Sequence, residues 1–407
     1  MTRIAWGVLL VVLLGIVIPA YGGDAGQATV QNLLKDLKSA EYQKAWAAAR
    51  ELETFPQFKA EIAPALLEAL NREWPQCSGD IRETIGVSLG RLVGKDAVFP
   101  LLQLLQSGKN IAHECAECGC CFLALTPGDV VTERSFDPFC ENAVLAAINQ
   151  LADFSHSKAM ADLVTQGKWK PELIITIGKV GLPRYAHFIS KHKDDSDVGT
   201  RIAVARGLGL IDNQQVAVPV LIQLLGKGNE EFDVRWEATN SLIAVGKRGK
   251  NQTVRGRLAD LMKERDKWTV VLAARALAQL GEAAGLQRLR EMATEADPKI
   301  RAEAMLALGE AADAGAKERL IGRLEDENLA VRAVAIYALG RTADAALAPT
   351  LARALEASLQ YQAELESRLK RGTGEAALRQ QYGYGVYDLR QTAQEALDAI
   401  KQGKPQK

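Results

Sequence analysis

The chain has 407 residues, of which 48% are hydrophobic, 6% aromatic and 25% charged. Its 50 basic and 50 acidic residues cancel, which excludes a strongly basic protein, and we expect no nucleic-acid partner. High aliphatic content with few aromatic residues is typical of helical arrays built from Ala and Leu, which grow by stacking repeats.

Residues 1–22 have the pattern of an export signal. A charged start precedes an apolar run from Ile4 to Ile18, and Ala20-Tyr21-Gly22 offers a cleavage site of the small-x-small type. The alternative is an uncleaved membrane anchor, in which residues 4–20 make the only membrane contact. In both cases we expect an extracytoplasmic location, periplasmic or secreted, for the rest of the chain.

From residue 29 onward, apolar positions recur with helical spacing and predict pairs of antiparallel helices. The first two pairs are predicted at Val30–Leu37 with Tyr42–Leu52 and at Phe58–Trp74 with Ile81–Val93. The third pair, Ala97–Gln106 with Phe139–Ala152, is interrupted by an insertion at residues 108–136. Insertions of this length within a compact repeat are usually functional or disordered.

The insertion carries four of the six cysteines, and the other two, Cys77 and Cys140, flank it. Because equivalent turns of stacked helix pairs lie along one rim, all six should be neighbours. In an oxidising compartment this predicts disulfide bonds among Cys77, Cys115, Cys118, Cys120, Cys121 and Cys140, with the pairing left open. The alternatives are redox-active thiols, or a zinc, copper or iron site held by His113, Cys115, Cys118, Cys120 and Cys121. No other cofactor is expected.

Regular helix pairs follow the insertion. Their second helices are predicted at Pro171–Val180, Val198–Ile211, Val234–Val245, Trp268–Leu280, Pro298–Ala311 and Ala330–Arg341. The last pair is split again, because a long first helix at Leu347–Leu369 is followed by a Tyr- and Gly-rich insertion at residues 371–387. Residues 403–407 form a tail.

The second helices share a signature: an aliphatic residue and Arg, two residues, Ala, two residues, Ala-Leu-Gly. It is complete at Val331, Arg332, Ala335, Ala338, Leu339 and Gly340 and again at Ile300, Arg301, Ala304, Ala307, Leu308 and Gly309. Partial copies contain Arg82, Arg201, Arg235 and Arg390. This repetition resembles the HEAT-like repeats of phycobilisome-lyase-type proteins. The resemblance implies an all-α fold, a right-handed α-solenoid of about ten armadillo-like two-helix repeats over residues 23–402.

In HEAT-like repeats the second helix lines the concave side, so the resemblance also implies a binding face. Its residues lie one, five and nine positions after the signature Arg: Ile202, Arg206, Trp236, Asn240, Leu306, Tyr337 and Arg341. Aromatic and Arg side chains are typical interface anchors. The alternative is that Trp236 and Leu306 only fill gaps between helices. The signature Arg residues are predicted to be structural, pairing with turn acids of their own or neighbouring repeats, such as Asp233, Asp297 and Asp326.

The sequence thus predicts an exported scaffold that binds a protein partner through its concave face and its insertion-bearing rim. A metal-binding or thiol-redox protein centred on Cys115–Cys121 is the alternative. A lyase or hydroxylase activity rests on repeat-family analogy alone. Deoxyhypusine hydroxylase has similar repeats but uses paired His-Glu motifs, and here only His113-Glu114 has that dipeptide. We therefore assign no catalytic residue.

Overall fold

The computed structural model describes residues 24–70, 72, 79–106, 143–249, 251–341, 344–369 and 398. Regular structure in these ranges consists of α-helices and short 3-10 turns, which confirms the predicted all-α class. The export signal, both insertions and the tail lie outside these ranges. No helix in the described ranges is long and apolar enough to cross a bilayer.

The described residues form two compact units, residues 24–168 and 169–398. The helices of the first unit are α1 (Asp24–Leu37), α2 (Tyr42–Leu52), α3 (Lys59–Leu70), α4 (Gly79–Val93), α5 (Val98–Gln106), α6 (Ala143–Leu151) and α7 (Ser157–Thr165). First helices pack on first helices, α1 on α3 and α5 on α7, whereas α2, α4 and α6 form a second row. Helix α1 begins at Asp24 rather than at the predicted Val30, because the small residues between them extend the helix without an apolar pattern.

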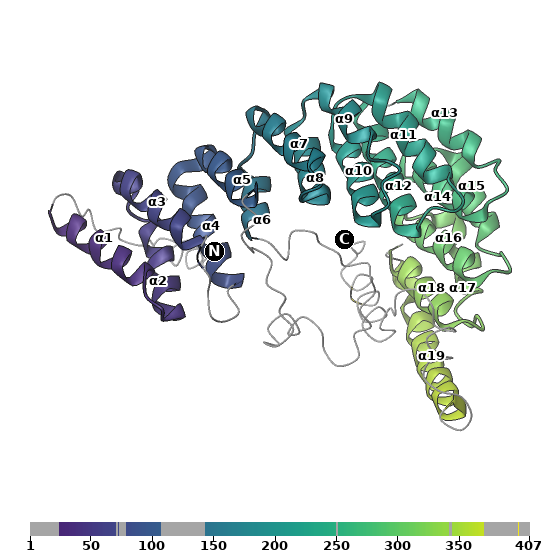
Figure 1. Ribbon diagram of the computed structural model, residues 1–407. Coiled ribbons are helices and arrows are strands. Elements are labelled where there is room, and N and C mark those ends of the chain that lie inside the picture. The colour runs from purple at the N-terminus through teal and green to yellow at the C-terminus, as the bar shows by residue number, and fades with distance from the viewer. Residues whose placement is uncertain are drawn as a thin grey trace, which may run out of the picture. The chain divides into compact units, whose positions relative to one another are not determined.

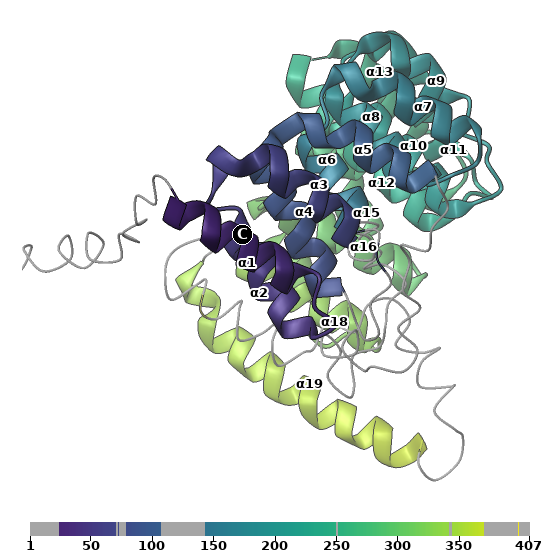
Figure 2. The same ribbon diagram turned by 60° about the vertical axis from the view of Figure 1, so that its left-hand side comes forward.

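The second unit repeats this two-row arrangement. Its helices are α8 (Lys170–Val180), α9 (Ala186–Ser190), α10 (Val198–Leu210), α11 (Gln214–Gly226), α12 (Phe232–Gly249), α13 (Gln252–Leu261), α14 (Lys267–Gln279), α15 (Ala283–Met292), α16 (Pro298–Glu310), α17 (Lys317–Ile321), α18 (Leu329–Arg341) and α19 (Ala348–Leu369). Within this unit the even-numbered helices α8 to α18 line the inner side of a curved row, and α9 to α17 lie outside them (Figure 1). Helix α19 packs on α18 and is itself one long, uninterrupted helix (Figure 2).

Aspartate caps start the inner helices α10 and α14. The Asp197 carboxylate accepts the Thr200 N–H at 2.7 Å, and Asp266 accepts the Thr269 N–H at 2.9 Å. Such caps satisfy backbone donors that the first helical turn leaves unpaired. The caps therefore fix where α10 and α14 begin.

Small residues let neighbouring inner helices approach closely. A methyl group added at Gly178 on α8 would lie 2.5 Å from the Cα of Gly207 on α10, so the two backbones are in direct contact. At the other end of the unit, Gly309 on α16 faces Ala338 on α18 in the same way. The Ala-Leu-Gly end of the repeat signature thus serves helix packing.

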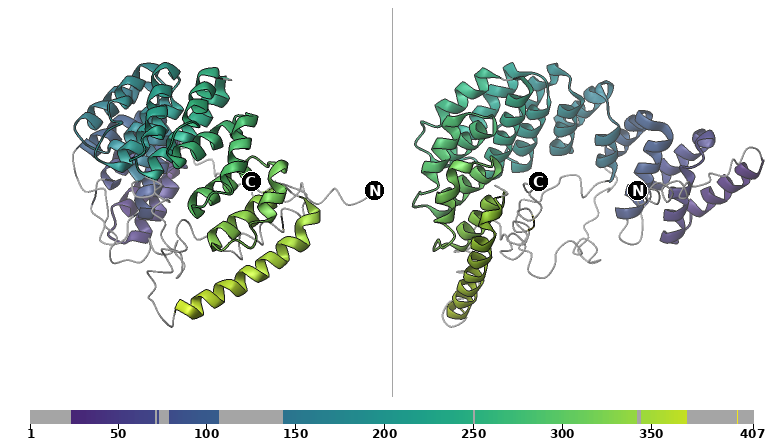
Figure 3. Two further views of the ribbon diagram at one scale, coloured as in Figure 1. Left: turned by 90° about the vertical axis from the view of Figure 1, so that its right-hand side faces the viewer. Right: turned by 180° about the vertical axis from the view of Figure 1, so that it is seen from behind.

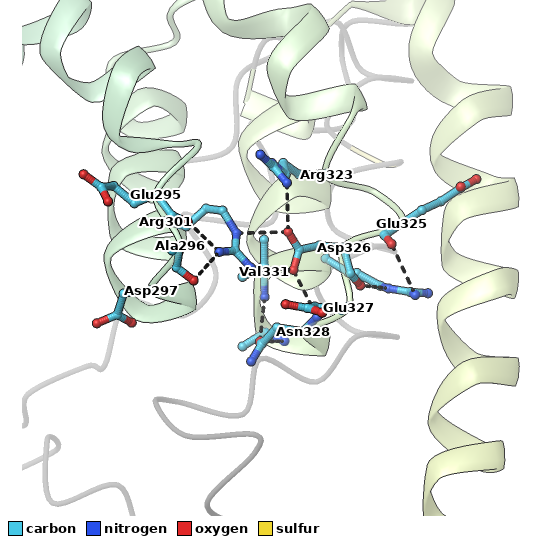
Figure 4. Close-up of polar contacts among 12 residues, drawn as sticks. Glu295, Ala296, Asp297, Arg301, Arg323, Glu325, Asp326, Glu327, Asn328 and Val331 are labelled. Carbon is cyan, nitrogen blue, oxygen red and sulfur yellow. Dashed lines mark hydrogen bonds and ion pairs between the residues drawn. The ribbon is translucent and has the colours of Figure 1, made fainter.

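The signature Arg residues join the turns of successive repeats, as Figure 4 shows for Arg301. Its guanidinium donates to both carboxylate oxygens of Asp326 at 3.0 and 2.9 Å and to the carbonyl oxygens of Glu295 and Ala296 at 2.6 and 3.1 Å. The Asp326 carboxylate also accepts the backbone N–H of Asn328 at 3.0 Å. This network confirms the predicted structural role of Arg301 and its pairing with Asp326.

Two other signature arginines behave similarly with different partners. Arg201 donates to Glu230 at 2.9 Å, and Arg235 donates to Asp266, the cap of the next inner helix. The acid comes from the following repeat because the guanidinium reaches across the inter-repeat turn rather than back to its own helix. The prediction that turn acids of the same or a neighbouring repeat pair with the signature Arg residues is therefore confirmed for both.

Candidate functional site

The predicted binding residues all lie on inner helices of the second unit: α10, α12, α16 and α18. Each is half-buried, between the fully buried signature positions and open solvent. The row of inner helices is visible from two further directions in Figure 3. We refer to this surface of α10 to α18 as the inner face.

An aromatic group occupies the N-terminal ends of α12 and α14 on the inner face. The ring centroids of Phe232 and Trp236 are 5.8 Å apart, and those of Phe232 and Trp268 are 4.9 Å apart. The guanidinium carbon of Arg275 lies 3.9 Å from the centre of the Trp236 ring, a cation–π contact. Trp236 is therefore held in place by neighbours on its own helix and on α14.

Arg275 is the polar centre of the inner face and is only 5% exposed. Its Nε and Nη2 donate to the two carboxylate oxygens of Glu310 on α16 at 2.7 and 3.1 Å, and its Nη1 donates to Asn240 Oδ1 at 2.9 Å. Gln279 Nε2 donates to the same Glu310 carboxylate at 2.8 Å. One buried guanidinium thus ties α12, α14 and α16 together, because a planar Arg fork matches a carboxylate bidentately.

A second bidentate pair connects α10 to α12. Arg206 donates from Nε and Nη2 to the Glu237 carboxylate at 3.0 and 3.2 Å. The Arg206 side chain is 37% exposed and Glu237 is 16% exposed, so solvent weakens the attraction. The Arg206–Glu237 pair therefore acts mainly by fixing two long side chains on the inner face.

The structure brings some of the predicted residues together and leaves others apart. Trp236 and Asn240 share Arg275, and Arg206 is joined to their helix through Glu237. The remaining predicted residues are half-buried at equivalent positions of α10, α16 and α18, namely Ile202, Leu306, Tyr337 and Arg341. A binding role for the seven residues stays a prediction.

The sequence argument missed Arg275, although a signal for it was present. In α14 the signature Arg is replaced by Val270, so the helix was not aligned with the other repeats. Aligning Asp266 and Thr269 with the equivalent cap residues of α10 would have placed Arg275 at the position of Arg206. In α14 the cap residues, rather than the signature Arg, show how the helix aligns with the other inner helices.

Two turn acids, Asp266 and Glu230, have a lowered pKa. Burial alone would raise the pKa of Asp266, but hydrogen bonds from the Thr269 hydroxyl and backbone and from Arg235 outweigh it and hold that pKa below its ordinary value. At Glu230 burial would likewise raise the pKa, but the hydrogen bond from Arg201 is the chief opposing cause, and the pKa of Glu230 is lowered. Their charges belong to the structural turns.

The predicted cysteine site lies outside the described residues. This applies to His113 and to all six cysteines, including Cys77 and Cys140, so their bonding stays a prediction. Within the ranges that the structure covers, no group of three or more His, Cys, Asp or Glu side chains is arranged to hold a metal ion.

Comparison with known proteins agrees with the repeat architecture. The HEAT-repeat family matches residues 292–366, which span α16, α17, α18 and most of α19. Residues 292–366 carry HEAT repeats. The matched segment contains both complete copies of the signature, Ile300–Gly309 and Val331–Gly340. No curated protein matches the chain.

Solved structures similar to this chain differ widely in length. An engineered protein is 22% identical, with 54% of this chain and 97% of that chain covered and a TM-score of 0.31. The complex of CpcE and CpcF of phycocyanin lyase from Nostoc is 16% identical, with 79% of this chain and 90% of that chain covered and a TM-score of 0.27. Karyopherin Kap121p, in complex with the extreme C-terminus of the protein phosphatase Cdc14p, is 14% identical, with 93% of this chain but 38% of that chain covered and a TM-score of 0.39. TM-scores below 0.5 give these likenesses no weight for function.

Proposed function

We propose that the chain is an interaction scaffold whose HEAT repeats bind a protein partner on the inner face. The observation that carries the proposal is the locked aromatic and Arg cluster around Trp236 and Arg275. Trp, Tyr and Arg dominate the binding energy of protein interfaces, and side chains already fixed in place lose little entropy on binding. The half-buried Tyr337 on α18 extends this surface along the row.

The proposal extends to location and to the rim. Residues 1–22 would direct the scaffold out of the cytoplasm, and the insertion at residues 108–136 would provide a second contact surface stabilised by disulfide bonds. The intact mass of the exported protein, with and without reductant, tests this part. A mass gain of about six hydrogens corresponds to three disulfides, whereas stoichiometric zinc, copper or iron would favour the metal-binding alternative.

The main experiment compares capture of partners by tagged wild-type protein and by the double variant Trp236→Ala, Tyr337→Ala. Loss of two anchors should reduce recovery of a specific partner at least about 30-fold, because a hot-spot residue contributes about 2 kcal/mol or more. Phe154→Ala is the matched control, since this 62% exposed aromatic side chain belongs to the first unit. Equal recovery by the double variant, at unchanged helicity, would refute the inner face as the binding surface.

A further inference from the structure

The inner face presents two amide side chains whose orientation is forced by charged neighbours. Arg275 has only donors, so the atom of Asn240 that it contacts at 2.9 Å must be the oxygen. The Glu310 carboxylate has only acceptors, so the atom of Gln279 that it contacts at 2.8 Å must be the amide nitrogen. Asn240 therefore directs its NH2 group, and Gln279 its carbonyl oxygen, away from the central ion pair.

These two outward groups are left unused by the part of the chain that the structure describes. Asn240 Nδ2 and Gln279 Oε1 make no hydrogen bond within it, and neither is a fully buried atom. Both residues are half-buried, so water can reach them when nothing is bound. The inner face thus offers one fixed donor and one fixed acceptor from adjacent helices, α12 and α14.

A donor and an acceptor of this kind complement a peptide backbone. Each peptide unit carries one C=O and one N–H, and only an extended segment leaves both free, because helices and sheets use them internally. Adjacent packed helices lie about 8–10 Å apart, a step comparable with the roughly 7 Å between alternate residues of an extended chain. One extended segment can therefore meet both amides in turn.

The charges near these amides indicate what kind of segment fits. Arg275 is neutralised by Glu310 and Arg206 by Glu237, both bidentately. Among the described residues, both arginines are thus already paired and offer no free charge to a charged segment, whereas Trp236 and Phe232 offer apolar contact. The local surface favours an uncharged partner.

We infer that the inner face binds an extended, uncharged peptide segment of its partner by its backbone, with Asn240 donating to a carbonyl and Gln279 accepting an N–H. This inference rests on the proposed function and specifies the chemistry of the partner. Arg275 acts as a positioning residue, because it orients Asn240 directly and Gln279 through Glu310.

Two substitutions remove the outward groups and keep the inward ones. Asn240→Asp retains an oxygen for Arg275 but replaces the outward donor with an acceptor. Gln279→Lys retains a donor for Glu310 but removes the outward acceptor. Gln287→Glu and Gln287→Lys are matched controls, because they add the same charges at an exposed position of the outer helix α15.

The probe is a random linear dodecapeptide library displayed on phage and panned on the full chain, followed by fluorescence anisotropy with the selected peptides. We expect uncharged sequences whose affinity falls about tenfold with Asn240→Asp and with Gln279→Lys, and stays unchanged with either Gln287 variant. Affinity should vary little with salt, and N-methylation of single backbone amides in the peptide should abolish binding at one or two positions. Unaltered circular dichroism and thermal unfolding show that the variants fold.

Each contrary outcome overturns the inference. A library without binders, peptides that bind Asn240→Asp as tightly as the wild type, or N-methylation without effect would each exclude backbone recognition. The proposed function fails separately, through undiminished partner capture by the Trp236→Ala, Tyr337→Ala variant. If capture depends on Trp236 while the amide variants bind normally, the scaffold function stands and backbone recognition is wrong.

Discussion

Removal of the Asp326 carboxylate should destabilise the C-terminal repeats more than any exposed charge substitution. Arg301 and Asp326 are 5% and 2% exposed, so water cannot replace the lost partner. In Asp326→Ala the guanidinium loses two charge-assisted hydrogen bonds and the Asn328 N–H loses its acceptor. Breaking a buried pair from one side costs about 3–5 kcal/mol, and we expect a loss in that range.

The assay is urea unfolding followed by circular dichroism, with hydrogen exchange to locate the loss in α16 to α18. Asp326→Asn keeps one acceptor oxygen and should lose about 1–3 kcal/mol. Asp260→Ala is the control. The Asp260 and Lys263 side chains form an ion pair but are 63% and 77% exposed, so the pair should contribute no more than about 0.5 kcal/mol to stability. Combining Asp326→Ala with Arg301→Met should cost less than the sum of the single changes, since no orphaned charge remains. A loss for Asp326→Ala as small as that for Asp260→Ala would refute a desolvated, structural ion pair.

Three further predictions concern packing, backbone conformation and pH. Gly178→Ala should lower the unfolding free energy measured in urea by about 1–3 kcal/mol, because its methyl group would collide with Gly207. Gly256→Ala on α13, where the added methyl group meets open space, should raise it by about 0.5–1 kcal/mol. Equal effects of the two substitutions would contradict the close contact. Ala312 has φ 48°, so Ala312→Gly should raise the unfolding free energy by about 0.5–1 kcal/mol, and a lowered melting temperature would argue against the left-handed conformation. Because the folded-state pKa of Asp266 is lowered, the stability that its carboxylate contributes is present above the ordinary Asp pKa and is lost as pH falls through the folded-state pKa. Urea midpoints measured from about pH 6 to pH 3 should therefore fall less steeply for Asp266→Asn than for the wild type. Identical slopes would count against the lowered pKa.

The sequence predicted the repeats well because their packing is local and periodic. Arg301, Ala304 and Gly309 recur at fixed spacing in α18, and that spacing determines which side of the helix is buried. Helix positions and the structural role of Arg301 followed from it. The handedness of the solenoid, the repeat count and the continuity over residues 23–402 stay predictions.

The chemistry of the inner face was harder to predict because it depends on contacts between repeats. Arg235 pairs with Asp266 of the next repeat, and Arg275 pairs with Glu310 on the adjacent inner helix α16. Neither pair follows from the periodicity of a single helix. Trp236 and Asn240 were predicted as neighbours on one helix, whereas the guanidinium that links them comes from α14, where the signature is incomplete.

Arg275 has a mechanical consequence for the second unit. It holds α12 and α16 from the helix between them, so bending or stretching the row at α14 must break a bidentate bond, an amide bond and a ring contact together. At the other end of the row, α8 and α10 meet through the backbones of Gly178 and Gly207. Under load the segment from α12 to α16 should therefore resist bending as one unit, because these three contacts must break at the same time.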